Sequence, residues 1–274
     1  MAWRIYREPA MLVGGLRALM IQALHPLAIT AVADHSDYRS DLWGRFVRTS
    51  NYVMTTIFGT TRQAEALGAR VREMHRSIRG VDRVTGMPYA ADDPDLLLWI
   101  HVTLVESFLV AYRRFVGPLD AAEADRYVAE MVRQAQLVGL RADEVPATEE
   151  ANQRLVGSYR PILRVTRPAL EAVDTVLDPP LPAWGRPFWW AVGQAAISLL
   201  PDHALSLLGL RRNAAAEAVV RPLVRGGGAL SRGWLPPQPV VRQAYRRAAE
   251  AGIDRGSAPP TPRPGENHRR AVAA

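Results

Sequence analysis

Apolar residues recur every three or four positions along most of this 274-residue chain. Within residues 38–58, this spacing is kept by Leu42, Phe46, Thr49, Val53 and Ile57, with threonine as the polar member. The period places side chains on one face of an α-helix, whereas a half-buried strand alternates every second residue. Runs of alternating residues bounded by hairpin turns are absent from the sequence, and we expect residues 80–93 to form a loop. The sequence therefore predicts an all-α fold.

Helix-capping residues divide the chain into segments. Asp93 precedes Pro94 as a cap before a first-turn proline, and Asp120 with Glu123 forms the pattern of a capping box. A helix through residues 61–80 is expected to end at Gly80. Further helices are expected at 149–157, 159–176, 186–200, 203–209, 213–224 and 238–251. The glycines at 226–228 are expected to form a flexible turn.

The chain is expected to form a single domain over residues 1–255. The prolines at 179, 180 and 182 could mark a boundary, but apolar helical segments continue on both sides of them. Residues 256–274 are polar and rich in proline, which is typical of a disordered tail.

The chain contains no cysteine. This excludes structural disulfides, iron–sulfur clusters, thiolate-ligated haem, cysteine nucleophiles and cysteine zinc sites. A metal or a cofactor iron must therefore be held by histidine or by carboxylate side chains.

The net charge of +7 is carried by arginine, because the sequence has no lysine. The arginines are scattered along helices and do not alternate with aromatic residues in a stripe, so we expect no nucleic-acid partner. The basic charge would favour peripheral contact with anionic lipid. The apolar run 11–33 contains Arg17, His25 and Pro26, which argues for buried helices over a membrane span. With no recognisable export signal, we expect a cytoplasmic protein that can contact a membrane.

Three histidines, His25, His75 and His101, fall on apolar helical faces. Taken one at a time, each is best interpreted as a core histidine with a single hydrogen bond. The sequence contains no HExxH pair, no Glu-x-x-His pair, no serine-hydrolase elbow, no phosphate loop and no dinucleotide-binding fingerprint. A zinc site built from the dispersed histidines has no positive support.

His75 differs from the other two because arginines flank it. Arg72 lies three residues before it and Arg79 four residues after it, which on one helix places all three side chains on the same face. Haem b needs an axial imidazole, an apolar slot and cations for its two propionates, and this set could supply them. The competing interpretation is that both arginines face solvent.

Two short motifs resemble those of a known family. The run Arg72-x-x-His75-x-x-x-Arg79 is similar to the proximal-helix motif of the latex-clearing (rubber) oxygenases and of the wider family that they share with the fungal MpaB oxygenase. Upstream, Arg45-Phe-Val-Arg48-Thr49 resembles the Arg-x-x-Lys-Thr motif on the distal helix of that family. The resemblance extends over residues 10–250.

The resemblance implies a globin-like helical domain that holds haem b, with His75 as the proximal iron ligand. It further implies that Arg72 and Arg79 contact the cofactor and that Thr49, Arg45 and Arg48 belong to the catalytic side. Molecular oxygen and a small apolar substrate, such as an alkene or a lipid-like molecule, would be the reactants. Arg48 departs from the family pattern, because a guanidinium stays protonated and has no lone pair for iron where lysine has one.

Two other functions fit the same sequence. One is a haem-binding protein without catalysis, such as a sensor or a carrier. The other is a cofactor-free helical protein that binds apolar ligands, in which the histidines are core residues. The sequence indicates neither the substrate nor the oligomeric state.

Overall fold

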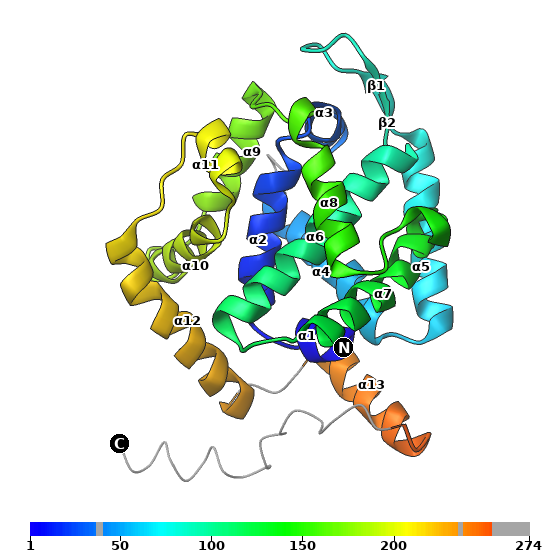
Figure 1. Cartoon of the computed structure of the whole chain (residues 1–274), viewed down its shortest axis with the longest axis vertical. Coiled ribbons are helices and arrows are strands. Elements are labelled where there is room, and N and C mark those ends of the chain that lie inside the picture. Colours follow the sequence, from blue (N-terminus) through cyan, green and yellow to red (C-terminus); the bar gives the residue numbers. More distant parts are fainter. Residues whose placement is uncertain (37–40, 235–237, 254–274) are drawn as a thin grey trace.

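The computed structural model describes residues 1–36, 41–234 and 238–253 of the chain. These residues form thirteen α-helices, two short 3-10 helices and one two-stranded sheet, which confirms the all-α class (Figure 1). The α-helices are α1 (Ala2–Tyr6), α2 (Met11–Gln22), α3 (Pro26–His35), α4 (Leu42–Phe58), α5 (Thr61–Ser77), α6 (Pro94–Phe115), α7 (Ala121–Val138), α8 (Glu149–Ser158), α9 (Arg167–Leu177), α10 (Arg186–Ser198), α11 (Asp202–Leu208), α12 (Ala214–Trp234) and α13 (Pro239–Glu250). The 3-10 helices are η2 (Ala142–Glu144) and η3 (Arg160–Ile162), and the strands are β1 (Arg79–Val81) and β2 (Pro88–Ala90). The predicted tail, residues 256–274, lies outside the described residues.

Helices α2 and α6 pack against each other at the centre of the molecule (Figure 1). Gly14 of α2 permits their close approach, because a Cβ atom there would lie 2.8 Å from the Phe108 ring and 3.2 Å from the Ser107 carbonyl oxygen. Trp99 of α6 is completely buried, and its Nε1 donates to the Gln22 carbonyl oxygen at 3.4 Å. The α2–α6 pair thus forms the tightly packed core of the fold.

A partly buried ion pair lies at the edge of this core. The guanidinium of Arg17 on α2 donates to the Glu106 carboxylate at 3.0 Å and to the Ser107 hydroxyl at 2.6 Å. Its Nε also donates to the Leu199 carbonyl oxygen at 2.9 Å, which connects the pair to the end of α10. Because the charge is paired and hydrogen-bonded, Arg17 is accommodated inside an otherwise apolar helix.

Helix α6 is long and apolar enough to cross a membrane, but 67% of its apolar window is buried inside the fold. Helices α2 and α3 are long and apolar enough only when taken together, and the pair is bent by 104°. The bend occurs at His25, whose ring caps α3 by accepting a hydrogen bond from the Ala28 amide at 3.4 Å. The expected buried helices are therefore present, and Pro26 occupies the first turn of α3.

The prediction of a loop over residues 80–93 holds for residues 82–87 and 91–93 and was wrong for the two strands between and beside them. Arg79–Val81 pairs in antiparallel register with Pro88–Ala90. Asp82 organises the turn, accepting hydrogen bonds from the Thr30 hydroxyl at 2.7 Å and the Thr85 amide at 2.8 Å. Gly86 provides the left-handed residue, with φ of 71°. Three-residue strands are too short for an alternating pattern to be visible in the sequence.

Two further boundaries differ from prediction. The expected single helix over 159–176 is divided into η3 and α9, because Pro161 and Pro168 each occupy a first turn and neither can donate a backbone hydrogen bond. The glycines at 226–228 lie inside α12 and do not form a turn. A glycine run lowers helix stability without forbidding the helix, and α12 is also supported by packing on α10.

Candidate functional site

Helices α4 and α5 form a hairpin joined by Gly59 and Thr60. Thr60 begins α5 with a capping box, in which its hydroxyl accepts from the Gln63 amide at 3.2 Å. Because the connection is short, the two helices pack against each other. The N-terminal half of α4 and the C-terminal half of α5 are about equally far from the turn along the chain, so both lie at the open end of the hairpin. This hairpin carries every residue predicted for the site except Arg79.

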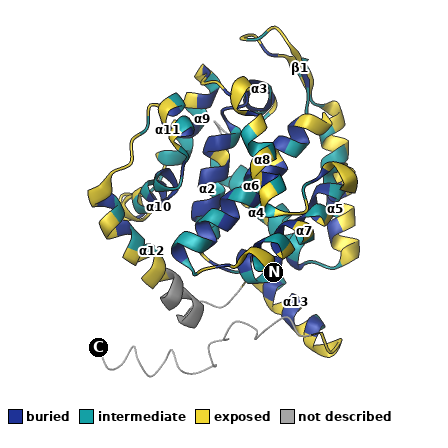
Figure 2. Ribbon diagram, in the orientation of Figure 1, coloured by how far each residue is buried: buried dark blue, intermediate teal, exposed yellow. Residues whose placement is uncertain are grey.

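The hairpin buries few of its apolar residues (Figure 2). Among the residues of α4, only Phe58 is fully buried, and in α5 only Ala64 and Gly68 are. Val47 and Met74 are exposed, and most of its other large apolar side chains are half-buried: Trp43, Phe46, Val53, Met54, Ile57, Leu67 and Val71. Helices with clear apolar faces normally bury them against protein. The hairpin therefore offers apolar surface that the rest of the chain covers only in part.

His75 lies in the last turn of α5 and is half-buried. Its Nδ1 atom is buried and has no hydrogen-bond partner. Burial lowers the pKa of His75, and the nearby Asp92 carboxylate opposes this shift. The ring is therefore neutral at pH 7, which leaves an imidazole lone pair available to a ligand.

Arg72 lies one turn before His75 and points toward α7. Its guanidinium donates to the Leu137 carbonyl oxygen at 2.5 Å. The same carbonyl oxygen lies 2.6 Å from the position that a Cβ atom of Gly68 would take. Arg72 and Gly68 therefore both bring α5 close to the last turn of α7.

Arg79 does not share the helix face of His75, so this part of the prediction was wrong. Helix α5 ends at Ser77, and Arg79 is the first residue of β1. Its guanidinium forms a bidentate pair with Asp92, including a contact of 2.9 Å between Nη2 and Oδ2. Asp92 nevertheless keeps Arg79 in the same region, because that carboxylate interacts electrostatically with both Arg79 and His75.

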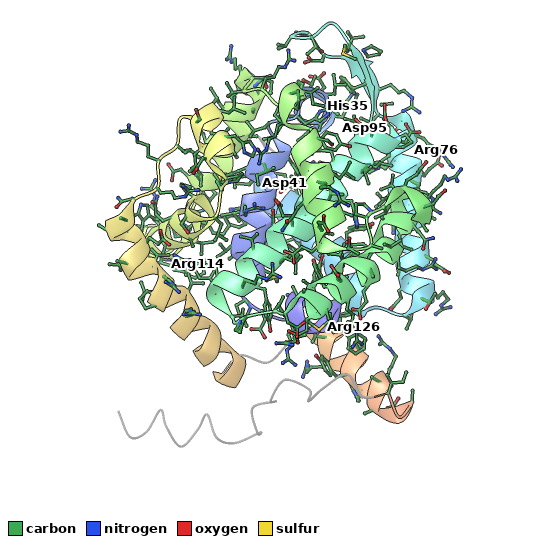
Figure 3. The ribbon with its side chains drawn as sticks, viewed as in Figure 1. His35, Asp41, Arg76, Asp95, Arg114 and Arg126 are labelled. Carbon is green, nitrogen blue, oxygen red and sulfur yellow. The ribbon has the colours of Figure 1, made fainter. Side chains whose placement is uncertain are left out.

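The three residues predicted on α4 lie in its N-terminal half. Arg45 is half-buried and donates to the Ser36 hydroxyl, whereas Arg48 is exposed and pairs with the helix-capping Asp41 at 2.9 Å. Hydrogen bonding to Arg48 lowers the pKa of Asp41, which is labelled in Figure 3. Thr49 is exposed. The Arg48 guanidinium is thus turned toward the start of α4.

Two residues of this region were missed in the sequence. Tyr52 on α4 has a buried hydroxyl without a hydrogen-bond partner, and burial raises its pKa to about 12 against the opposing charge of Arg72. Its position seven residues after Arg45 on the same helix was the available signal. Asp92 directly precedes the helix cap Asp93 and carried no signal of its own.

Residues 3–232 match the family described as ER-bound oxygenase mpaB/B'/Rubber oxygenase, catalytic domain. The chain belongs to this family. Because the matched domain is an oxygenase catalytic domain, the chain is an oxidoreductase of the oxygenase type. Neither the curated proteins nor the solved structures gave a match.

Among the other described histidines of this oxygenase-family chain, His25 caps α3, and its Nε2 atom is likewise buried without a hydrogen-bond partner. His101 is buried in α6, where burial lowers its pKa to about 4. His35 contacts the Arg79 carbonyl oxygen at 3.2 Å, and His203 lies on α11. Within the described ranges, no group of three His, Asp or Glu side chains could hold a metal ion.

Proposed function

We propose that this oxygenase-family chain is haem b-dependent, with His75 as the proximal iron ligand, and that it acts on a small apolar substrate. The observation that carries the proposal is a neutral, half-buried imidazole whose buried Nδ1 has no partner, set on a helix hairpin with partly uncovered apolar faces. A buried polar atom without a partner is costly, so it indicates a missing interaction.

The residues present fit this cofactor. Haem requires one axial protein ligand, because the porphyrin supplies the equatorial ligands of the iron. A single imidazole is what the hairpin offers, and the described part of the chain has no side-chain cluster that could replace the porphyrin. The half-buried apolar side chains of α4 and α5 would cover the faces of the macrocycle.

Bound haem would supply the redox-active iron that activates dioxygen. His75 would bind it through one ring nitrogen, and the other nitrogen would need a hydrogen-bond acceptor to fix the ring. Asp92 is the charged group in electrostatic contact with the ring.

Arg72 and Arg79 are the cations available for the propionates. Arg79 is exposed and pairs with Asp92 at the surface, where an ion pair contributes little stability and can exchange partners. Arg72 would keep its hydrogen bond to Leu137 with one nitrogen, because a guanidinium has five N–H donors.

Residues of α4 would act on the oxygen and substrate side. Arg48 cannot ligate iron, so the distal position would be open or filled by water, oxygen or another residue. The Thr49 hydroxyl would donate a hydrogen bond there, and Arg45 and Arg48 would supply positive charge that stabilises reduced oxygen.

An absorption spectrum tests the cofactor assignment. The chain, purified from cells supplied with a haem precursor, should show a Soret band. His75→Ala should remain folded and lose the band, while the matched control His203→Ala should retain it. A normal Soret band in His75→Ala would remove His75 from this role, and a colourless wild-type chain would favour the cofactor-free alternative.

Turnover tests the enzyme against a haem carrier. Oxygen consumption should depend on added alkene. Thr49→Ala should keep the Soret band and lose turnover, whereas Ser50→Ala, which removes the neighbouring hydroxyl on α4, should keep both. Unchanged turnover in Thr49→Ala would show that its hydroxyl is incidental.

A further inference from the structure

A second surface of the molecule exposes large aromatic side chains. Residues 179–201 contain one charged residue, Arg186. Within this stretch Trp184 is 85% exposed, Phe188 is 64% exposed and Trp190 is 51% exposed. Three exposed side chains of this size within seven residues form an apolar patch, which indicates a binding surface.

The aromatic residues are held outward by a buried neighbour. Trp189 is buried, and its Nε1 donates to the Val176 carbonyl oxygen at 2.8 Å. Its ring also meets Trp43 of α4 edge-on at a centroid distance of 5.4 Å. Because adjacent helical residues point in different directions, fixing Trp189 inward directs Phe188 and Trp190 toward solvent.

Helix α12 packs beside α10 at the same edge of the molecule and adds an apolar stripe (Figure 1). Val219 is 57% exposed and Leu223 is 59% exposed, four residues apart on one face. Ala215, Pro222 and Gly226 are also exposed and continue this stripe at helical spacing. An amphipathic helix normally turns its apolar face inward, but no described residue covers this stripe.

Arginines without acidic partners accompany both elements. Arg186 begins α10, and within the described part of the chain Arg186, Arg221 and Arg225 form no ion pair. Burial, followed by the charges of Arg221 and Arg225, lowers the pKa of Arg114, so these three cations lie close together (Figure 3 labels Arg114). Glu217 pairs with Arg114 and offsets one charge.

We propose that the exposed residues of 184–190 and of α12 form a docking surface for an anionic lipid bilayer. Aromatic rings at the polar–apolar boundary and arginines beside an apolar helix face are the chemistry that binds such an interface. The positive charge of the surface selects a bilayer over a neutral apolar partner. Beside the rings lies a cavity of about 240 Å³ lined in part by Leu177, Leu181, Arg186 and Trp190, with Asp178 also in its wall.

Vesicle sedimentation of the full chain tests the proposal. The chain should bind vesicles of phosphatidylcholine mixed with phosphatidylglycerol, bind phosphatidylcholine alone more weakly, and lose affinity as salt increases. Binding is measured without turnover, so its result is independent of the haem assignment. A wild-type chain that does not bind the anionic vesicles would overturn the proposal.

Variants locate the surface. Combining Trp184→Ser, Phe188→Ser and Trp190→Ser should weaken binding by at least roughly tenfold, because each ring loses its apolar contact. The matched control combines Val81→Ser, Val84→Ser and Met87→Ser at the β-hairpin, which removes comparably exposed side chains and should leave binding unchanged. Equal binding by both variants, or loss only in the hairpin variant, would contradict the assignment.

Two further measurements distinguish a bilayer from a second copy of this chain. Brominated lipid should quench tryptophan fluorescence, and quenching should weaken in Trp184→Phe. Sedimentation velocity should give the same molecular mass for the wild-type chain and the triple aromatic variant. A dimer that the triple variant loses, without vesicle binding, would assign the surface to self-association and overturn the lipid proposal.

Discussion

The two helix pairs α2–α6 and α4–α5 differ in how they use their apolar residues. Helix α6 buries thirteen residues of twenty-two, whereas α4 buries one residue of seventeen. Gly14 brings α2 into direct contact with α6, while Trp43 and Phe46 of α4 stay half-buried. The first pair supplies stability. The second pair is amphipathic, and the described part of the chain covers its apolar faces only in part, which is where the proposed cofactor would bind.

The largest expected effect concerns the core pair. Trp99→Ala should lower the free energy of unfolding by about 3–5 kcal/mol, because a completely buried ring leaves a cavity. Urea denaturation of the haem-free chain measures it. Trp184→Ala is the matched control and should have little effect, since that ring is 85% exposed. A loss below about 1 kcal/mol in Trp99→Ala would show that α2–α6 is not the stabilising pair.

A pH effect of similar size should arise in the same pair. The pKa of His101 is lowered from 6.5 to about 4 in the folded chain. As pH falls, His101 is therefore protonated in the unfolded chain before it is protonated in the folded chain. The contribution of neutral His101 to the free energy of unfolding is complete above pH 6.5 and is lost toward pH 4. The free energy of unfolding should fall by about 3 kcal/mol, a value that follows from the size of the pKa shift. Urea unfolding at several pH values measures it, and His101→Leu should flatten the profile; an unchanged slope would contradict the assignment.

A smaller effect on stability is expected in the hairpin. Phe46→Ala should cost the haem-free chain only about 1–2 kcal/mol, because the ring is half-buried. It should, however, reduce haem retention, measured as the ratio of Soret to protein absorbance. A destabilisation as large as that of Trp99→Ala, with haem retained, would remove the contrast between the two pairs.

The smallest expected effect on stability is that of Arg48→Ala. Arg48 and Asp41 form an exposed pair, so the urea midpoint should not change measurably. Turnover should fall, because the variant removes positive charge from the oxygen side. Arg62→Ala, an exposed arginine at the start of α5, is the control for both readouts. Arg48→Ala with full turnover would place Arg48 outside the catalytic group.

Helix identity was predictable from the sequence, because capping residues and apolar spacing are local signals. The side chains of Asp93, Asp120 and Thr60 all cap helices, as their residue types predict. Family membership was also visible, in the two arginine motifs and their order. The short β-hairpin was not, because its pairing depends on Asp82 and Thr30, which lie far apart along the chain.

The candidate site was only partly predictable for the same reason. His75 could be singled out by its neighbours on one helix. The partners of those neighbours, Leu137 for Arg72 and Asp92 for Arg79, come from other elements. The spacing of Tyr52 from Arg45 places it on the same helix face, but its orphaned hydroxyl exists only once the helices have packed.

The carbonyl oxygen of Leu137 contacts α5 at two residues. It packs against Gly68, which has no Cβ atom, and accepts a hydrogen bond from the Arg72 guanidinium. These two contacts hold α5 against the last turn of α7, one and two turns before His75. A one-residue insertion between Arg72 and His75 would leave both contacts intact and turn the imidazole by about 100°.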